Sequence, residues 1–314
     1  MHLTCGEIRR NDRSPKREKY TPLHTSTFRD YLHLHLVILA WGFTAVLGKL
    51  IEIPPVEVVM WRTGLAAFGF AAVAKWLRQS LILNRSDQLT MMSLGALLGL
   101  HWLLFFASAR LSTASVCLAA MPTMMLWCSL IEPWVDGSRR WRPWELLVGS
   151  IILGAVWLIY EVEFRYWQGF SVGIVAALLA AIFSVANKRC VSRIHYAVMG
   201  CYQMIGAFVA CALVWPFLGL SFSVPTPTDF LAIFVLASLC TVWAYAGYMK
   251  VLRKLSVFTV NVFYNLEPLY GMALAVLIFG SEEHMSGGFY TGASIIIGSV
   301  FLVPWIQQRR GTRT

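Results

Sequence analysis

The sequence is short of charge. Asp, Glu, Lys and Arg together make up only 13% of its 314 residues, whereas soluble domains carry about a quarter. Hydrophobic residues make up 58%, and they gather in runs of about 20 residues, each long enough to cross a bilayer core roughly 30 Å thick. Short segments of alternating hydrophobicity, which a membrane β-barrel needs, are absent. The composition therefore argues against a soluble domain and predicts an all-α polytopic membrane protein.

Motifs for nucleotide and metal chemistry are missing as well. The sequence contains no P-loop, no glycine-rich dinucleotide fingerprint and no HExxH. Its seven cysteines form no CxxC and lie mostly in apolar runs, so we interpret them as small buried hydrophobic residues. We expect no enzyme activity, no cofactor and no metal site. If the protein transports a solute, it must use a gradient of substrate or of a coupling ion.

The net charge of +10 is explained by orientation in a membrane, and no nucleic acid is expected to bind. With the N-terminus in the cytoplasm, 22 of the 26 Lys and Arg residues fall in cytoplasmic segments. Only Lys49, Arg110 and Arg165 fall outside, and Arg62 lies within a span. This positive-inside bias predicts an even number of spans, with both chain ends in the cytoplasm.

The hydrophobic runs give ten candidate spans. We interpret residues 1–32 as a disordered, basic cytoplasmic tail rather than a signal peptide, because no small-residue cleavage site follows it. Residues 307–314 form a second basic cytoplasmic tail. The predicted spans are 33–51, 55–77, 90–109, 111–132, 144–160, 169–190, 197–219, 229–250, 255–279 and 288–306.

The two halves of the chain share a faint pattern. AVLGK (45–49) resembles SVANK (184–188), and LSTASV (111–116) resembles LSVFTV (255–260). LSTASV precedes Pro122 in its span, and LSVFTV precedes Pro268 in its span. Because each half has five helices, an odd number, the second repeat must be inverted in the membrane. We therefore divide the chain into repeats at 33–160 and 161–306, an arrangement typical of secondary transporters.

In its ten predicted spans and its two repeats, the chain resembles the EamA family of the drug/metabolite transporter superfamily. The resemblance spans about residues 33–306 and rests on the repeats, on WGFTAVLGK in the first span and on NLEPLYGMALAVLIFG in the ninth. It implies ten helices, a central cavity between the repeats, and secondary transport in the bacterial inner membrane, often export of amino acids or other small metabolites. Many members carry a glutamate after the glycine that ends span 9, whereas Ser281 follows Gly280 here.

Two charged residues inside the spans are candidates for substrate binding. Glu267 is about 18 Å from the inner end of span 9, which is roughly 12 Å from the outer side of a 30 Å hydrocarbon core. Arg62 is about 10 Å from the outer end of span 2, so the two residues lie at similar depths in the membrane. An arginine can bind a carboxylate through two hydrogen bonds, and a glutamate can bind an ammonium group or a proton. A permanent structural ion pair is the alternative. In the second repeat, Gln203 occupies the position of Arg62.

Other polar and aromatic residues could complete the site. His101, about 17 Å deep in span 3, could relay protons or bond the substrate, or simply join two helices. Pro268 is expected to kink span 9. We predict a substrate-binding set of Arg62, His101, Trp102, Trp127, Gln203, Tyr245, Asn261, Tyr264, Asn265 and Glu267.

Several remaining residues have simpler interpretations. Lys49, Asn187 and Lys188 lie near span ends, where we expect their side chains to reach the lipid headgroups. Small residues in GALLG (95–99) and GLAAFG (64–69) are expected to let helices approach closely.

The sequence as a whole predicts alternating-access transport of a small polar metabolite, an amino acid or similar. The expected partners are this small molecule, membrane lipid and protons as the coupling ion, with Glu267 or His101 as the titrating group. Export is the direction that the resemblance favours, and the chain could act as a monomer or a homodimer. The alternatives are a non-transporting membrane scaffold or sensor, and a transporter of nucleotide sugars or cationic drugs.

Overall fold

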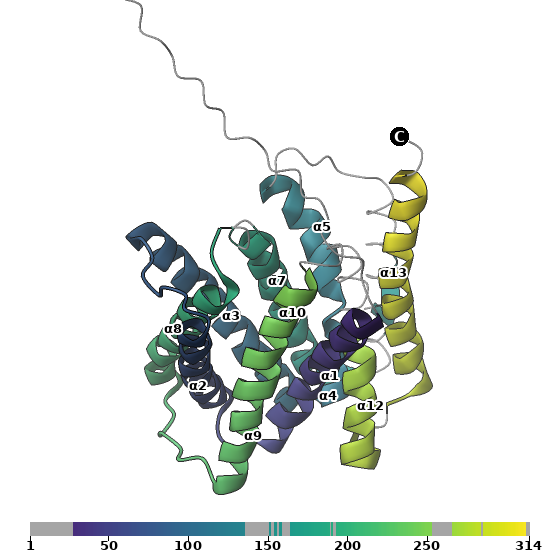
Figure 1. Ribbon diagram of the computed structural model, residues 1–314. Coiled ribbons are helices and arrows are strands. Elements are labelled where there is room, and N and C mark those ends of the chain that lie inside the picture. The colour runs from purple at the N-terminus through teal and green to yellow at the C-terminus, as the bar shows by residue number, and fades with distance from the viewer. Residues whose placement is uncertain are drawn as a thin grey trace, which may run out of the picture.

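The structure is a bundle of helices (Figure 1). This computed structural model describes residues 28–135, 151, 154–155, 157–158, 164–188, 190, 193–252, 266–283 and 285–311, and no strand occurs among them. Six of the described helical segments are long and apolar enough to cross a membrane, which is the fold class expected of a polytopic membrane protein. The helices are α1 (Phe28–Leu50), α2 (Pro55–Trp76), α3 (Arg85–Leu111), α4 (Ala114–Ala120), α5 (Thr123–Val135), α7 (Trp167–Lys188), α8 (Tyr196–Val214), α9 (Pro227–Ala237), α10 (Ala244–Leu252), α12 (Glu267–Phe279) and α13 (Gly287–Gly311).

Local sequence signals set several helix boundaries. Pro55 opens α2 at a position where its missing N–H costs nothing. Asn84 caps α3 through a hydrogen bond from the Asp87 amide, and Thr226 caps α9 in the same way. The first helix begins at Phe28, five residues before the predicted span. Most of the predicted span 144–160 and residues 255–265 of the predicted span 9 lie outside the described residues.

Two predicted spans are not continuous α-helices. Span 4 breaks at Met121 and Pro122 into α4 and α5, because proline cannot donate the helical hydrogen bond and its ring clashes with the preceding turn. Span 8 contains a π-helical turn, η3 (Ser238–Trp243), between α9 and α10. In span 9, Pro268 lies in the first turn of α12, where a proline is tolerated.

Glycines set the closest helix contacts. A Cβ atom on Gly95 of α3 would lie 2.0 Å from the Gln203 carbonyl oxygen of α8, and one on Gly206 would lie 2.1 Å from that of Met92. This confirms the expected close packing at GALLG. Gly42 of α1 also lies close to Gly271 of α12, since its Cβ would lie 2.8 Å from the Gly271 amide nitrogen.

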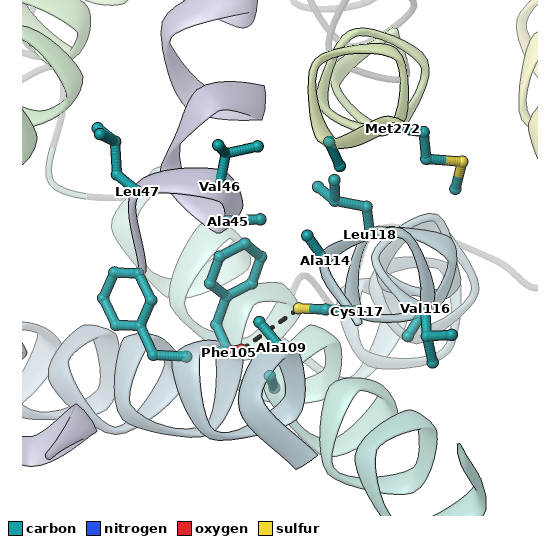
Figure 2. Close-up of a cluster of buried hydrophobic side chains, with 14 of the residues drawn as sticks. Ala45, Val46, Leu47, Phe105, Ala109, Ala114, Val116, Cys117, Leu118 and Met272 are labelled. Atoms are coloured by element: carbon teal, nitrogen blue, oxygen red, sulfur yellow. Dashed lines mark hydrogen bonds between the residues drawn. The ribbon is translucent and has the colours of Figure 1, made fainter. Parts of the chain in front are cut away.

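The largest apolar core lies where α1, α3, α4 and α12 converge (Figure 2). Leu118, Met272 and Phe105 fill it, and the Cys117 thiol donates a 3.3 Å hydrogen bond to the Phe105 carbonyl. The six described cysteines form no disulfide, and all but Cys128 are buried. The interpretation of these cysteines as buried hydrophobic residues is confirmed.

The helix contacts between the two halves of the chain occur in related pairs. Helix α1 packs against α12 and α10, and α7 packs against α5 and α3. Similarly, α2 packs against α9 and α8 against α3, while α2 and α8 pack against each other. If these helices are numbered as predicted spans, exchanging span 1 with span 6, span 2 with span 7 and so on converts each contact into another on this list. The contact between α2 and α8 is converted into itself.

Candidate substrate-binding site

Arg62 is the centre of the candidate site. Its side chain is only 1% exposed, and its Nε donates a 2.8 Å hydrogen bond to Thr241 Oγ1. The guanidinium carbon lies 4.0 Å from the centroid of the Trp102 ring and 5.8 Å from that of Phe106. The Nη1 atom is buried and has no hydrogen-bond partner among the described residues. Since an unpaired buried donor is costly, this edge of Arg62 is well suited to bind an anionic group.

The π-helical turn η3 places Thr241 against Arg62. The Thr241 hydroxyl donates a 2.7 Å hydrogen bond to the carbonyl of Leu236, five residues earlier. By contrast, Thr63 of α2 donates to Val59, four residues earlier, as in a regular helix. Because its one proton is used on Leu236, Thr241 must accept the hydrogen bond from Arg62. Such π-turns are often found at functional sites.

Glu267 lies at the start of α12 and is 9% exposed. Its carboxylate is close enough to interact electrostatically with Arg62, as is the Cys240 side chain. The close contact between Gly42 and Gly271 holds this end of α12 against α1. A helix N-terminus also stabilises negative charge. The structure thus brings together the two charged residues whose depths matched in the sequence.

His101 is fixed to a neighbouring helix. Its Nδ1 lies 2.8 Å from the Ala176 carbonyl oxygen of α7, and since a carbonyl only accepts, Nδ1 carries the proton. The ring packs against Phe105 at 6.1 Å between centroids. Arg62 is close enough to interact electrostatically with His101. The histidine is therefore a neighbour of the Arg62 site, and one of its nitrogens already has a structural partner.

Gln203 forms a second polar cluster instead of joining Arg62. It is fully buried, and its Nε2 donates a 2.8 Å hydrogen bond to Asn187 Oδ1. The Tyr245 hydroxyl lies 3.4 Å from Gln203 Oε1. The prediction that Asn187 reaches the headgroups is wrong, because this residue is 7% exposed and bonded inside the bundle. Arg62 and Gln203, which the predicted repeat places at equivalent positions, are thus the centres of one charged and one neutral polar cluster.

A comparison with protein families matches the second part of the chain to a transporter family. Residues 167–305 match the EamA-like transporter family, which is part of the drug/metabolite transporter superfamily. This half of the chain belongs to the EamA-like family. The EamA-like half supplies Thr241, Gln203 and Glu267, whereas Arg62, His101 and Trp102 come from helices before it.

The chain also shares its fold with solved structures. One, titled only "Crystal structure of protein", is 16% identical, with a TM-score of 0.64 over 90% of this chain and 99% of that one. At this identity the likeness shows the fold alone. A search of curated proteins found no match.

Of the remaining predicted residues the structure describes only Trp127, and it does not bring Trp127 to Arg62. Trp127 lies on α5, which packs mainly against α7, and its buried Nε1 has no hydrogen-bond partner among the described residues. Asn261, Tyr264 and Asn265 lie outside the described residues, so their roles stay predictions.

A serine-hydrolase pattern in the EamA-like half is also accounted for by helix packing. Gly169 to Gly173 read GFSVG, which matches the GxSxG nucleophile motif, but they lie inside α7. That motif requires a sharp turn between a strand and a helix. Gly173 instead packs closely against Ala120 and Ser108. Among the described residues, no group of three or more potential ligands could hold a metal.

Sequence reasoning missed two buried carboxylates near the predicted outer ends of the spans. Glu57 is fully buried and accepts hydrogen bonds of 3.0 Å from Trp215 Nε1 and from the Ser223 amide. Asp229 is 4% exposed and accepts a 2.9 Å hydrogen bond from the Glu52 amide. A signal for Asp229 was present, because the run TPTD has the spacing of a helix capping box.

Proposed function

We propose that the protein is a secondary active transporter that moves a small polar metabolite across the membrane by alternating access. The observation that carries this proposal is the buried Arg62, whose Nη1 has no hydrogen-bond partner in the described part of the chain while Glu267 lies within electrostatic range. Ionisable residues inside a membrane bundle usually mark a substrate or ion pathway. Membership of the EamA-like transporter family and the long apolar helices support it.

Alternating access is supported by the helix contacts. Transporters built from inverted repeats rock one repeat against the other around a fixed site between them. The exchange symmetry of the contacts in this bundle is the pattern that such repeats produce. Arg62 and its partner Thr241 come from opposite halves of the chain, so relative motion of the halves would change the geometry of the site.

An amino acid or similar zwitterion is the proposed substrate. Its carboxylate would bind Arg62 Nη1, and its ammonium group would bind Glu267. Nucleotide sugars and sugar phosphates would require several cations in the cavity, whereas Arg62 is the only Lys or Arg among the described residues that is buried. One cation and one carboxylate match a substrate with one charge of each sign.

If transport is coupled to protons, Glu267 is the better carrier. His101 is held at Nδ1 by Ala176 and lies near the Arg62 cation, which would oppose a second positive charge. Glu267 has an opposite charge nearby and could exchange that partner for a proton during the cycle. Export is the direction proposed, in keeping with the family resemblance.

Counterflow in proteoliposomes tests the proposal. A panel of labelled amino acids and amines would be tested on the wild type and on Glu267→Gln, with and without a pH gradient. We expect uptake of at least one amino acid, stimulation by the gradient, and loss of that stimulation in the variant. Uptake that is the same in both proteins would reduce Glu267 to a structural residue. A lack of uptake of any panel member would favour the scaffold or sensor alternative, or another substrate class.

A further inference from the structure

Two capping segments at opposite ends of the bundle have the same design. Asn84 and Asp87 open α3, and the Asp87 amide donates a 2.8 Å hydrogen bond to Asn84 Oδ1. Thr226 and Asp229 open α9, and the Asp229 amide donates a 3.1 Å hydrogen bond to Thr226 Oγ1. Thr226 and Asp229 follow Asn84 and Asp87 by 142 residues in each case.

Each of these aspartates binds the loop that joins two helices of the other half. Asp229 Oδ1 accepts the hydrogen bond from the Glu52 amide, in the loop between α1 and α2. Asp87 Oδ1 lies 3.7 Å from Arg193 Nη2, in the loop between α7 and α8. Arg193 follows Glu52 by 141 residues, as Gln203 follows Arg62. We name the first contact the Glu52 latch and the second the Arg193 latch.

The two latches differ in strength. In the Glu52 latch the accepting residue, Asp229, is only 4% exposed, although Glu52 itself is exposed, and Arg110 adds a hydrogen bond from Nη2 to the Ile51 carbonyl of the same loop. The Arg193 latch is on the surface, with the Arg193 side chain 61% and the Asp87 side chain 22% exposed. Surface ion pairs contribute little, whereas buried hydrogen bonds to a charged group contribute more. The contact between the two halves is therefore stronger at the Glu52 end of the bundle than at the Arg193 end.

We propose that Asp229 and Asp87 are paired gate residues of the transport cycle. The Glu52 latch closes the face predicted to be outside, and the Arg193 latch closes the opposite face when the site opens outward. The structure is the state closed at the Glu52 end. This inference rests on the proposed alternating-access function, but its test needs no substrate.

Cys240 is a natural reporter for the test. It lies beside Arg62 in the candidate site and is 1% exposed, so a water-soluble thiol reagent can reach it only through an open face. Cys117 is fully buried in the apolar core of Figure 2 and reports general loss of packing. Membrane vesicles of both orientations would be treated with a membrane-impermeant maleimide, and labelling of each cysteine would be measured by mass spectrometry.

Four variants separate the latch from the helix cap. Asp229→Ala removes the latch and the hydrogen bonds that the carboxylate accepts from Thr226, but keeps the amide that Thr226 caps. Thr226→Val removes the cap hydroxyl and keeps the Asp229 carboxylate for Glu52. On the other face, Asp87→Ala removes the latch and the hydrogen bond that the carboxylate accepts from Asn84 Nδ2, and Arg193→Gln removes only the latch. We expect Asp229→Ala to raise Cys240 labelling from the Glu52 face by about tenfold or more, the effect of losing one hydrogen bond to a charged group. Thr226→Val, Asp87→Ala and Arg193→Gln should leave labelling from that face near the wild-type level.

Equal labelling of Cys240 from the Glu52 face in the wild type and in Asp229→Ala would overturn the proposal. So would a parallel rise in Cys117 labelling, because it would show that the substitution loosens the whole bundle. If Asp229→Ala does not fold, the milder Asp229→Asn should change labelling in the same direction by a smaller factor. Counterflow is measured separately, so failure of the gate and failure of the transport proposal are distinguishable.

Discussion

Arg62 on α2 donates its Nε hydrogen bond to Thr241, 179 residues later in the chain, across 2.8 Å. This contact joins the two halves of the bundle at a buried cation. It covers one edge of the guanidinium group, Trp102 covers one face, and Nη1 is left without a described partner. The arrangement fixes the direction from which an anionic group can bind.

Removing the Thr241 hydroxyl should weaken substrate binding. Thr241→Val keeps the shape of the side chain but frees Arg62 Nε, so the apparent KM in counterflow should rise about tenfold, as expected for one hydrogen bond to a charged group. Thr241→Ser should restore most of the affinity because it restores the acceptor. Thr63→Val is the matched control, since its hydroxyl bonds only to its own helix. An unchanged KM in Thr241→Val would show that the contact does not position Arg62.

Replacing Trp102 should also weaken binding, by a smaller factor. Trp102→Leu removes the ring that lies 4.0 Å from the guanidinium carbon, and a cation–π contact of this kind contributes about 0.5–2 kcal/mol. We expect a roughly threefold to tenfold increase in KM. Trp76→Leu is the control, because this residue is on α2 and is 81% exposed. Equal effects of the two substitutions would contradict a specific role for Trp102.

The Gln203 cluster should contribute to stability. Asn187→Ala leaves the Gln203 Nε2 donor without its oxygen partner inside the bundle, at a cost of about 1–3 kcal/mol. The midpoint of thermal unfolding in detergent should fall by several degrees. Gln79→Ala, in an exposed loop, should leave it unchanged. A midpoint that does not move in Asn187→Ala would show that the buried hydrogen bond contributes little.

The contact between α3 and α8 should not tolerate even a methyl group. Gly95→Ala would place a carbon 2.0 Å from the Gln203 carbonyl oxygen, so the helices must separate, and overpacking of this kind costs about 1–3 kcal/mol. Gly298→Ala on α13, where no atom lies within 4 Å, should be neutral or slightly stabilising because alanine favours helix. Thermal unfolding distinguishes them, and equal midpoints would contradict the close packing.

Much of the architecture can be predicted from the composition and from residues that mark helix boundaries. Long apolar runs place α2, α3 and α8 within a few residues, and Pro55 marks the start of α2. The depth argument singled out Arg62 and Glu267 because a charge inside an apolar run is costly wherever the helix packs. These features are local or depend only on distance from the span ends.

The parts that were missed depend on which helices meet. Thr241 faces Arg62 through a π-turn, and its side chain gives no sign of this in the sequence. Asn187 was assigned to the headgroups from its place near a span end, but Gln203 on the next helix holds it inside the bundle. Glu57 looks like an ordinary residue of a first helical turn until the fold brings Trp215 and Ser223 to it.

Counterflow with Arg62→Gln tests the central claim most directly. The control is Lys75→Gln, which removes a positive charge from the same helix at an exposed position. For an amino acid that the wild type transports, we expect Arg62→Gln to lose at least about 90% of the uptake, since a carboxylate would lose its charged partner, and Lys75→Gln to retain it. Uptake by Arg62→Gln at the wild-type rate and KM would contradict the account, because the substrate carboxylate would then bind elsewhere.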